Sequence, residues 1–191
     1  MIICIFCASS PKVAPCFFNA AAELTRMLVK EGHTIVYGGG GIGLMGEVAN
    51  TALSMNGKII GVIPRFMREV EWNHPDVEEM ISVETMADRK KLFFEKADAV
   101  IALPGGCGTL EELVEAISLK RLGKFTKPIV IFNQDGFYDS LITLLDHMIE
   151  ENFMRVEHKK IWSIANTVEE IMQAIADAPE WSADAIHFAA V

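Results

Sequence analysis

The stretch that decides the fold reads Pro104-Gly105-Gly106-Cys107-Gly108-Thr109-Leu110-Glu111-Glu112. It follows an apolar run, residues 99–103, and precedes apolar residues at helical spacing, so we expect a strand that ends in a glycine turn and opens a helix. The first N–H groups of a helix carry a partial positive charge that suits an anion, usually phosphate. Thr109 adds a hydroxyl to this turn, and Glu112 adds a carboxylate one turn further on. The stretch therefore predicts an anion site with an acidic side chain beside it.

The rest of the chain alternates short apolar runs with helical patterns. The runs expected to be strands are residues 2–6, 34–37, 58–63, 98–103, 128–132 and 161–164. Such strands alternating with helices predict a Rossmann-like α/β fold, a three-layer sandwich with a mostly parallel sheet and helices on both faces. We expect one domain over residues 1–178 and a loose C-terminal tail over residues 179–191. Ligands of these sheets bind at the carboxyl ends of the strands, where the glycine turn lies.

Composition and charge narrow the range of partners. The 191 residues are 51% hydrophobic, which suffices for one sizeable core. A formal net charge of −9 without a basic cluster argues against a nucleic-acid polymer as partner. No apolar run reaches the length of a membrane span and the first residues lack the basic start of a signal peptide, so we expect a cytoplasmic protein without membrane contact. The four cysteines show no metal-binding spacing, and we expect reduced thiols, no metal and no cofactor.

A second glycine run, residues 38–46, directly follows an expected strand. Its Gly41, Gly43 and Gly46 fit the G-x-G-x-x-G pattern of dinucleotide-binding turns, although tight packing of a helix on a strand also selects glycine. An NAD site needs an acidic residue near the end of the next strand, and that strand ends at Pro64-Arg65 instead. The run therefore favours contact with a nucleotide or sugar phosphate over an NAD site.

The helix that opens at the first glycine turn carries both acidic and apolar residues. Acidic residues in a first turn stabilise the helix dipole, which explains Glu111 and Glu112 without any function. The apolar residues expected to form its buried stripe are Leu110, Leu113, Val114 and Ile117. Glu112 is then expected on the opposite face with Thr109, where further apolar residues predict contact with a second subunit. In such a partly dry place a carboxylate needs a function or a partner.

Arg89 lies in a basic triplet, Arg89-Lys90-Lys91, which in most proteins is a solvated patch. At helical spacing, however, it shares a face with Met86 and Phe93, and an arginine on an apolar face usually binds a carboxylate or a phosphate. The residues alone leave both interpretations open. Cys107 is expected to be reactive at a helix start, but the five histidines form no pattern that supplies a base, which disfavours nucleophilic catalysis.

Three separate motifs together resemble the signatures of the LOG ("Lonely Guy") family, cytokinin riboside 5′-monophosphate phosphoribohydrolases that are often mislabelled lysine decarboxylases. The motifs are Tyr37-Gly-Gly-Gly-x-x-Gly43-Leu-Met-Gly46, Met86-x-x-Arg89-Lys90 and Pro104-Gly-Gly-x-Gly-Thr-x-x-Glu112. Cys7-x-Ser9-Ser10 and Phe132-Asn-x-Asp-Gly-Phe-Tyr138 also match, so the resemblance covers nearly the whole chain. It implies a Rossmann-like fold, a homodimer, and hydrolysis of the N-glycosidic bond of nucleoside 5′-monophosphates, including AMP, to free base and ribose 5-phosphate.

The resemblance also implies roles for the matching positions. Arg89 and Glu112 are expected to be the catalytic pair, and a small-molecule nucleoside 5′-monophosphate is the expected partner. The residues expected to line the substrate site are Ser9, Gly39, Gly40, Gly43, Glu71, Met86, Lys90, Gly105, Gly106, Cys107, Gly108, Thr109, Glu111 and Ser118. The chain departs from the family pattern at Ala8, Ala87, Cys107 and residues 118–121, which leaves the base open between adenine, a prenylated adenine and a pyrimidine.

The alternative is a non-catalytic protein that binds a nucleotide or carries the molybdenum cofactor. Such carriers share this fold and its glycine loops, but they have no need of the pair Arg89 and Glu112 and release no base. A decarboxylase that uses pyridoxal phosphate is a weaker alternative, because it needs a lysine for the Schiff base and no lysine stands out for that role.

Overall fold

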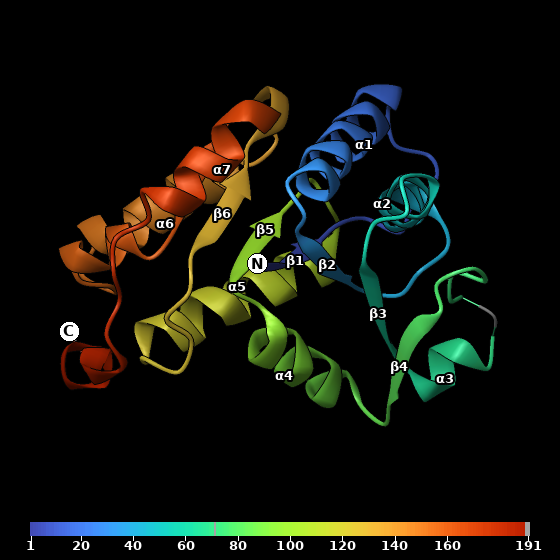
Figure 1. The fold of residues 1–191 in the computed structure, drawn as a ribbon. Coiled ribbons are helices and arrows are strands. Elements are labelled where there is room, and N and C mark those ends of the chain that lie inside the picture. Colours follow the sequence, from blue (N-terminus) through green and yellow to red (C-terminus); the bar gives the residue numbers. More distant parts are fainter. Residues whose placement is uncertain (71, 190–191) are drawn as a thin grey trace. The chain divides into compact units, whose positions relative to one another are not determined.

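The first part of the chain forms a parallel sheet with helices on both faces (Figure 1). A computed structural model describes residues 1–70 and 72–189, and the chain divides into two compact units, Met1–Asp98 and Ala99–Val191. The elements of the first unit are β1 (Ile2–Phe6), α1 (Pro15–Lys30), β2 (Thr34–Tyr37), α2 (Gly43–Ser54), β3 (Ile59–Pro64), α3 (Arg65–Arg68), β4 (Glu79–Val83) and α4 (Met86–Lys96). Helices α1 and α2 lie side by side on one face of the sheet, and α4 lies on the other.

The strands of the first unit are parallel, and the first three of them are almost wholly buried. The strands pair in parallel as β1–β2, β2–β3 and β3–β4, with Ile3 opposite Ile35 and Ile35 opposite Ile59. Almost every side chain of β1, β2 and β3 is buried. A strand covered on both faces has no polar side to alternate with, which explains why these three appear in the sequence as continuous apolar runs.

Strand β4 is absent from the strands expected on sequence grounds. Its residues are half-buried or exposed, with none fully buried, and it pairs with β3 from Glu79 opposite Ile60 to Val83 opposite Pro64. A strand that is partly exposed needs no continuous apolar run, so the hydrophobic pattern gave no signal for it. It extends the sheet of the first unit by a fourth strand.

The second unit repeats the alternation of strands and helices. Its elements are β5 (Ala99–Ala102), α5 (Cys107–Arg121), β6 (Ile129–Phe132), η1 (Gln134–Gly136), α6 (Asp139–Glu150), η2 (Val156–Lys160), β7 (Ser163–Ala165), α7 (Val168–Ala176) and η3 (Ala183–Phe188). The strands are again parallel, with Val100 opposite Ile129 and Ile131 opposite Ile164, and α7 packs on β6 and β7. The predicted α/β fold with parallel strands and flanking helices is confirmed. A single domain over residues 1–178 stays a prediction.

The segment after Pro179 packs against α5, where we expected a loose tail. The Trp181 indole N–H donates to the Lys120 carbonyl at 2.6 Å, and the Arg121 guanidinium donates through Nε and Nη2 to the Ala189 carbonyl at 2.9 and 2.6 Å. Ala185 is fully buried. Small apolar residues and a single indole carry little periodicity, so their packing was invisible in the sequence.

A buried histidine lies against this segment. The His158 ring is fully buried, with its centroid 6.4 Å from that of Trp181 and 6.5 Å from that of Phe188. Its Nδ1 accepts from the Arg155 backbone N–H at 3.0 Å, which assigns the ring proton to Nε2. Burial, and then the charge of Arg121, lowers the pKa of His158 below its usual value.

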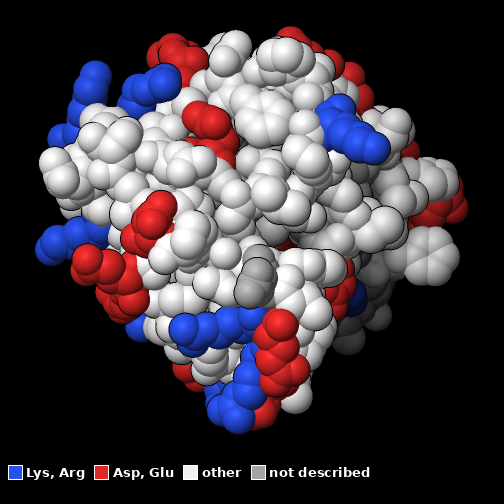
Figure 2. Space-filling model, turned by 90° about the vertical axis from the view of Figure 1, so that its right-hand side faces the viewer, with Lys and Arg blue, Asp and Glu red and all other residues white. Residues whose placement is uncertain are grey.

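Two further expectations concern membranes and charge. Within residues 1–70 and 72–189, no helix is both long and apolar enough to cross a membrane. On the face that Figure 2 turns towards the viewer, acidic and basic side chains are scattered among uncharged ones without a basic stripe. Proteins that bind nucleic-acid polymers usually present such a stripe.

Candidate functional site

The loops at the carboxyl ends of β1 and β2 pack tightly on each other. Gly43 has φ +65°, and a side chain there would overlap the backbone of Ser9. Gly39 has φ +76° and lies against β3, and Gly40 forms an isolated bridge with Asn73. The structure thus gathers Ser9, Gly39, Gly40 and Gly43 of the predicted site at one edge of the sheet. Glycine is needed at 39 and 43 because a positive φ strains other residues.

Arg89 reaches the same edge from α4. Its side chain is buried, at 6% exposure, and its Nε donates to the Val62 carbonyl at 3.0 Å. Its Nη2 donates to the Gly38 carbonyl at 2.9 Å, and its guanidinium carbon lies 5.2 Å from the centre of the Phe93 ring. The expectation that Arg89 shares an apolar face with Phe93 is confirmed. The guanidinium is therefore a buried, fixed charge that joins the ends of β2 and β3.

The rest of the basic triplet behaves differently. Lys91 is exposed and lies 3.7 Å from the carboxylate of Glu95, one turn along α4. Lys90 and Met86, both predicted to line the site, are half-buried. The solvated-patch interpretation therefore fits Lys91 but not Arg89. This difference follows from the helical period, which turns adjacent residues by about 100°.

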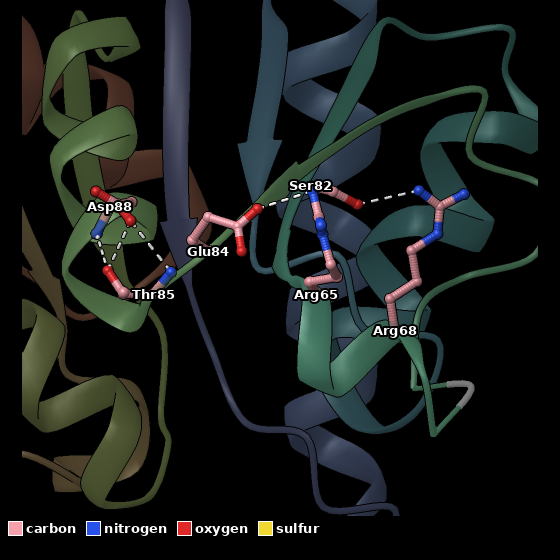
Figure 3. A network of polar contacts seen from close by, with 6 residues as sticks. All are labelled: Arg65, Arg68, Ser82, Glu84, Thr85 and Asp88. Carbon is pink, nitrogen blue, oxygen red and sulfur yellow. Dashed lines mark hydrogen bonds and ion pairs between the residues drawn. The ribbon is translucent and has the colours of Figure 1, made fainter.

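The first turn of α4 is held by a reciprocal cap (Figure 3). The Asp88 backbone N–H donates to Thr85 Oγ1 at 3.1 Å, while the Thr85 N–H and hydroxyl donate to Asp88 Oδ2 at 3.1 and 2.7 Å. In the same view Arg65 pairs with Glu84 at 2.7 Å, and Arg68 donates to Ser82 Oγ at 3.0 Å. The capping box satisfies helix N–H groups that would otherwise be unpaired. It fixes the start of the helix that carries Arg89.

The glycine turn of the second unit opens α5 as expected. Gly106 precedes the helix with extended backbone and has no side chain with which to cap it, and α5 begins at Cys107. A side chain at Gly105 would overlap that of Thr109, so the Thr109 side chain packs directly on the backbone of Gly105. Gly106, Cys107 and Gly108 are exposed while Thr109 is buried. Exposed backbone at a helix start is the arrangement that proteins use to bind phosphate.

Tyr138, the last residue of the Phe132–Tyr138 motif, braces this turn, and the candidate site did not include it. The Tyr138 hydroxyl donates to the Leu103 carbonyl at 2.7 Å, immediately before Pro104, and both residues are buried. Asn133 holds Tyr138 in turn, because its Oδ1 accepts the Tyr138 backbone N–H at 2.7 Å. The hydrogen bond fixes where β5 ends and where the glycine turn begins.

The predicted buried stripe of α5 is confirmed at Leu113 and Ile117 and wrong at Leu110 and Val114. The face that carries Thr109 and Glu112, predicted to contact a second subunit, is already buried in the single chain. Leu110 and Val114 are 40% and 42% exposed, whereas Glu112 is buried at 7% exposure. The buried side of α5 consists of Thr109, Glu112, Leu113, Ala116, Ile117 and Lys120. Both stripes have helical spacing and share Leu113 and Ile117. The sequence pattern followed the more apolar stripe, while the fold buries the one that carries polar groups at Glu112 and Lys120.

The remaining predicted site residues lie on the outer side of α5 or outside the described chain. Glu111 and Ser118 are exposed, and the Ser118 hydroxyl donates to the Val114 carbonyl of its own helix at 2.8 Å. Glu71 lies outside the described residues. Within the described part of the chain, no three side chains of metal-binding kinds form a cluster.

Two buried ionisable groups, Tyr37 in the first unit and Lys120 in the second, were missed in the sequence. Lys120 is 1% exposed, and burial lowers the pKa of its amine to about 8. The Tyr37 hydroxyl is buried without a hydrogen-bond partner among the described residues, and burial, then the nearby Cys7, raises its pKa. Lys120 follows Glu112 by eight residues, a helical spacing that could have signalled it.

Comparison with known proteins gives relatives along most of the chain. Residues 45–175 match the family model described as possible lysine decarboxylase. Cytokinin riboside 5′-monophosphate phosphoribohydrolase LOG2 of Arabidopsis thaliana is 38% identical over 175 residues, which is 92% of this chain and 82% of that one. LOG of Oryza sativa subsp. japonica is 39% identical over 180 residues, 94% of this chain and 74% of that one.

Solved structures with the same fold include proteins of another kind. The molybdenum cofactor carrier protein of Chlamydomonas reinhardtii superposes with a TM-score of 0.70 at 21% identity, covering 93% of this chain and 96% of that one. The molybdenum cofactor binding protein of Rippkaea orientalis gives 0.67 at 24% identity, covering 92% and 94%. At these identities the likeness shows the fold alone. The sequence relatives, which share far more residues over the same length, show that the chain belongs to the LOG family.

Proposed function

We propose that this protein hydrolyses the N-glycosidic bond of nucleoside 5′-monophosphates, giving free base and ribose 5-phosphate. The observation that carries the proposal is the buried carboxylate of Glu112, placed one turn after an exposed glycine turn at the start of α5. A phosphate site with a buried carboxylate beside it suits a substrate whose scissile bond lies close to a phosphate. The names of the relatives at 38–39% identity support the same reaction.

The glycine turn is the proposed phosphate anchor. The backbone N–H groups from Gly106 to Thr109 lie at the positive end of the α5 dipole, and Thr109 adds its hydroxyl. Gly105 supports the turn by leaving room for the Thr109 side chain. This anchoring would hold the 5′-phosphate and direct the ribose towards Glu112.

Glu112 is the proposed catalytic carboxylate. Cleavage transfers the electron pair of the C1′–N bond to the base, builds positive charge on the ribose, and forms a new bond from C1′ to a water oxygen. The proton that the water loses balances the one that the departing base gains. A carboxylate beside C1′ stabilises the cation and accepts the proton from the water.

Arg89 is the proposed electrostatic partner in the catalytic pair. A guanidinium remains charged at any working pH, so Arg89 is poorly suited to proton transfer. Two of its N–H groups already donate to the Gly38 and Val62 carbonyls, which holds the charge in one place. A fixed positive charge would orient a carboxylate or the nucleotide without reorganisation during the reaction.

The other predicted site residues remain part of this proposal. They are Ser9, Gly39, Gly40, Gly43, Glu71, Met86, Lys90, Cys107, Gly108, Glu111 and Ser118. Exposed apolar side chains lie beside the glycine loop of the first unit: Ile42 precedes Gly43, and the carbonyl of Trp72 accepts the Gly41 N–H at 3.0 Å. Such side chains suit the flat, largely apolar face of a base. AMP and prenylated adenine nucleotides are both compatible with them.

We also propose that the protein acts as a cytoplasmic homodimer. Leu110 and Val114 expose two apolar side chains one turn apart on α5, and Leu122 is 40% exposed near the end of the same helix. Apolar side chains that line one helix face favour burial against another subunit. Size-exclusion chromatography with light scattering measures this directly, and a monomeric mass would contradict it.

The reaction is tested with the purified protein and a panel of nucleoside 5′-monophosphates, including AMP and isopentenyladenosine monophosphate. Free base is quantified by chromatography, and Glu112→Gln should abolish its release while leaving the circular dichroism spectrum unchanged. Glu150→Gln is the matched control, since Glu150 is an exposed glutamate of α6. Full activity of Glu112→Gln would overturn the role of Glu112. Nucleotide binding without base release from any of them would favour a carrier instead.

A further inference from the structure

Gly38 is the point at which Arg89 meets the backbone of the sheet. It is the first residue after β2, and its carbonyl accepts a hydrogen bond from Arg89 Nη2 at 2.9 Å. Arg89 Nε donates to Val62, near the end of β3, at 3.0 Å. Because β2 and β3 are neighbours, the two hydrogen bonds fix both the position and the plane of the guanidinium.

Space at Gly38 is taken up by the same guanidinium. A Cβ atom built on Gly38 would overlap Arg89 Nη2 and lie 2.8 Å from Met45 Sδ. Gly38 is not among the glycines with positive φ, so its backbone conformation would accept alanine. The need for glycine at this position therefore comes from the arginine packed on it.

The adjacent glycines have other reasons to be glycine. Gly39 has a positive φ, which strains any residue with a side chain. The three atoms nearest to a Cβ at Gly40 would all belong to Met45, the closest being its methyl carbon at 2.9 Å. A flexible methionine end can move aside, whereas a guanidinium held by two carbonyls and lying over Phe93 cannot move without losing those contacts.

We infer that Gly38 is a positioning residue for Arg89, through both its carbonyl and its missing side chain. The inference rests on the proposed function, in which Arg89 belongs to the catalytic pair. A methyl group at position 38 would overlap Arg89 Nη2 and so displace the guanidinium. Displacements of about 1 Å in a catalytic constellation cost on the order of 100-fold in rate.

The kinetic test compares Gly38→Ala with the wild-type protein in base release from AMP. We expect kcat to fall by about 100-fold and KM to change by less than about threefold, because the nucleotide anchor is untouched. The double variant Gly38→Ala, Met45→Ala removes the second contact of the new methyl group and should remain impaired. Recovery of activity in this double variant would assign the effect to Met45 and overturn the inference.

A stability cycle tests the same pairing without relying on activity. Gly38→Ala should lower the midpoint of thermal unfolding in the wild-type background by several degrees. In an Arg89→Ala background it should have little effect, since the space taken by the guanidinium is then empty. An equal loss in both backgrounds would overturn the inference. If Gly38→Ala fails to fold, recovery of a folded protein by Arg89→Ala, Gly38→Ala supports the inference, and failure of that double variant overturns it.

The two tests separate the inference from the proposed function. A wild-type protein that releases no base from any nucleotide would contradict the proposed reaction, while the stability cycle would still decide whether Gly38 and Arg89 depend on each other. Base release by the wild-type protein together with additive stability losses would leave the reaction standing and remove Gly38 from it.

Discussion

Removal of the cap on α4 gives a prediction whose size follows from the hydrogen bonds of Thr85 and the usual cost of losing a helix N-cap. Thr85→Ala deletes the hydroxyl that accepts from the Asp88 N–H at 3.1 Å and donates to the Asp88 carboxylate at 2.7 Å. Thr85 is exposed, so little apolar burial is lost with it. Loss of a helix N-cap costs about 1 kcal/mol, within a range of roughly 0.5–2 kcal/mol.

This cost has a defined thermal signature. For a folded chain of 191 residues, about 1 kcal/mol lowers the midpoint of thermal unfolding by roughly 2–4 °C. Arg89 follows the cap by four residues and its backbone N–H donates to the Thr85 carbonyl at 3.2 Å, so fraying of this turn should also lower kcat for base release. Thr85→Ser is the matched control, because it keeps the hydroxyl and removes only a methyl group.

The assay is differential scanning calorimetry on the three proteins, followed by base release at a temperature well below unfolding. We expect Thr85→Ser to follow the wild type and Thr85→Ala to melt earlier. Equal midpoints for Thr85→Ala and the wild type would refute the reasoning, since they would show that the capping box adds no stability. Equal losses in both variants would assign the effect to the methyl group.

Three further predictions use buried polar groups. Tyr138→Phe leaves the buried Leu103 carbonyl without its 2.7 Å donor and should cost about 1–3 kcal/mol in urea unfolding, and an unchanged midpoint would contradict this. The pKa of His158 is lowered in the folded state, so the unfolded chain binds a proton at higher pH than the folded protein does. The free energy of unfolding should therefore fall as pH drops below the unfolded pKa of about 6.5. His158→Asn, which retains an acceptor for the Arg155 N–H, should show a weaker dependence of this free energy on pH. Burial lowers the pKa of Lys120 to about 8, so charging the amine is unfavourable in the folded state. Lys120→Met should therefore raise the free energy of unfolding at pH 7 by on the order of 2 kcal/mol, and the gain should shrink as pH rises above 8.

Several features of this protein follow from the sequence alone. The apolar runs predicted β1, β2, β3, β5 and β6 because strands buried on both faces have no polar side. Glycine next to a helical pattern predicted the turn that opens α5, since that local geometry depends on few residues. The shared face of Arg89 and Phe93 was predictable for the same reason, because spacing along one helix fixes it.

Other features depended on tertiary structure. The sequence offered two overlapping stripes on α5, and only packing decided that Glu112 and Lys120 are buried while Leu110 and Val114 are exposed. Strand β4 needed its neighbour β3, and the C-terminal segment needed the carbonyl of Lys120 and the guanidinium of Arg121. Gly38 and Arg89 are 51 residues apart, and no local pattern links a missing side chain to a distant guanidinium. Local periodicity determines which residues can share a face, but the free energy of burying that face is settled only by the elements that cover it.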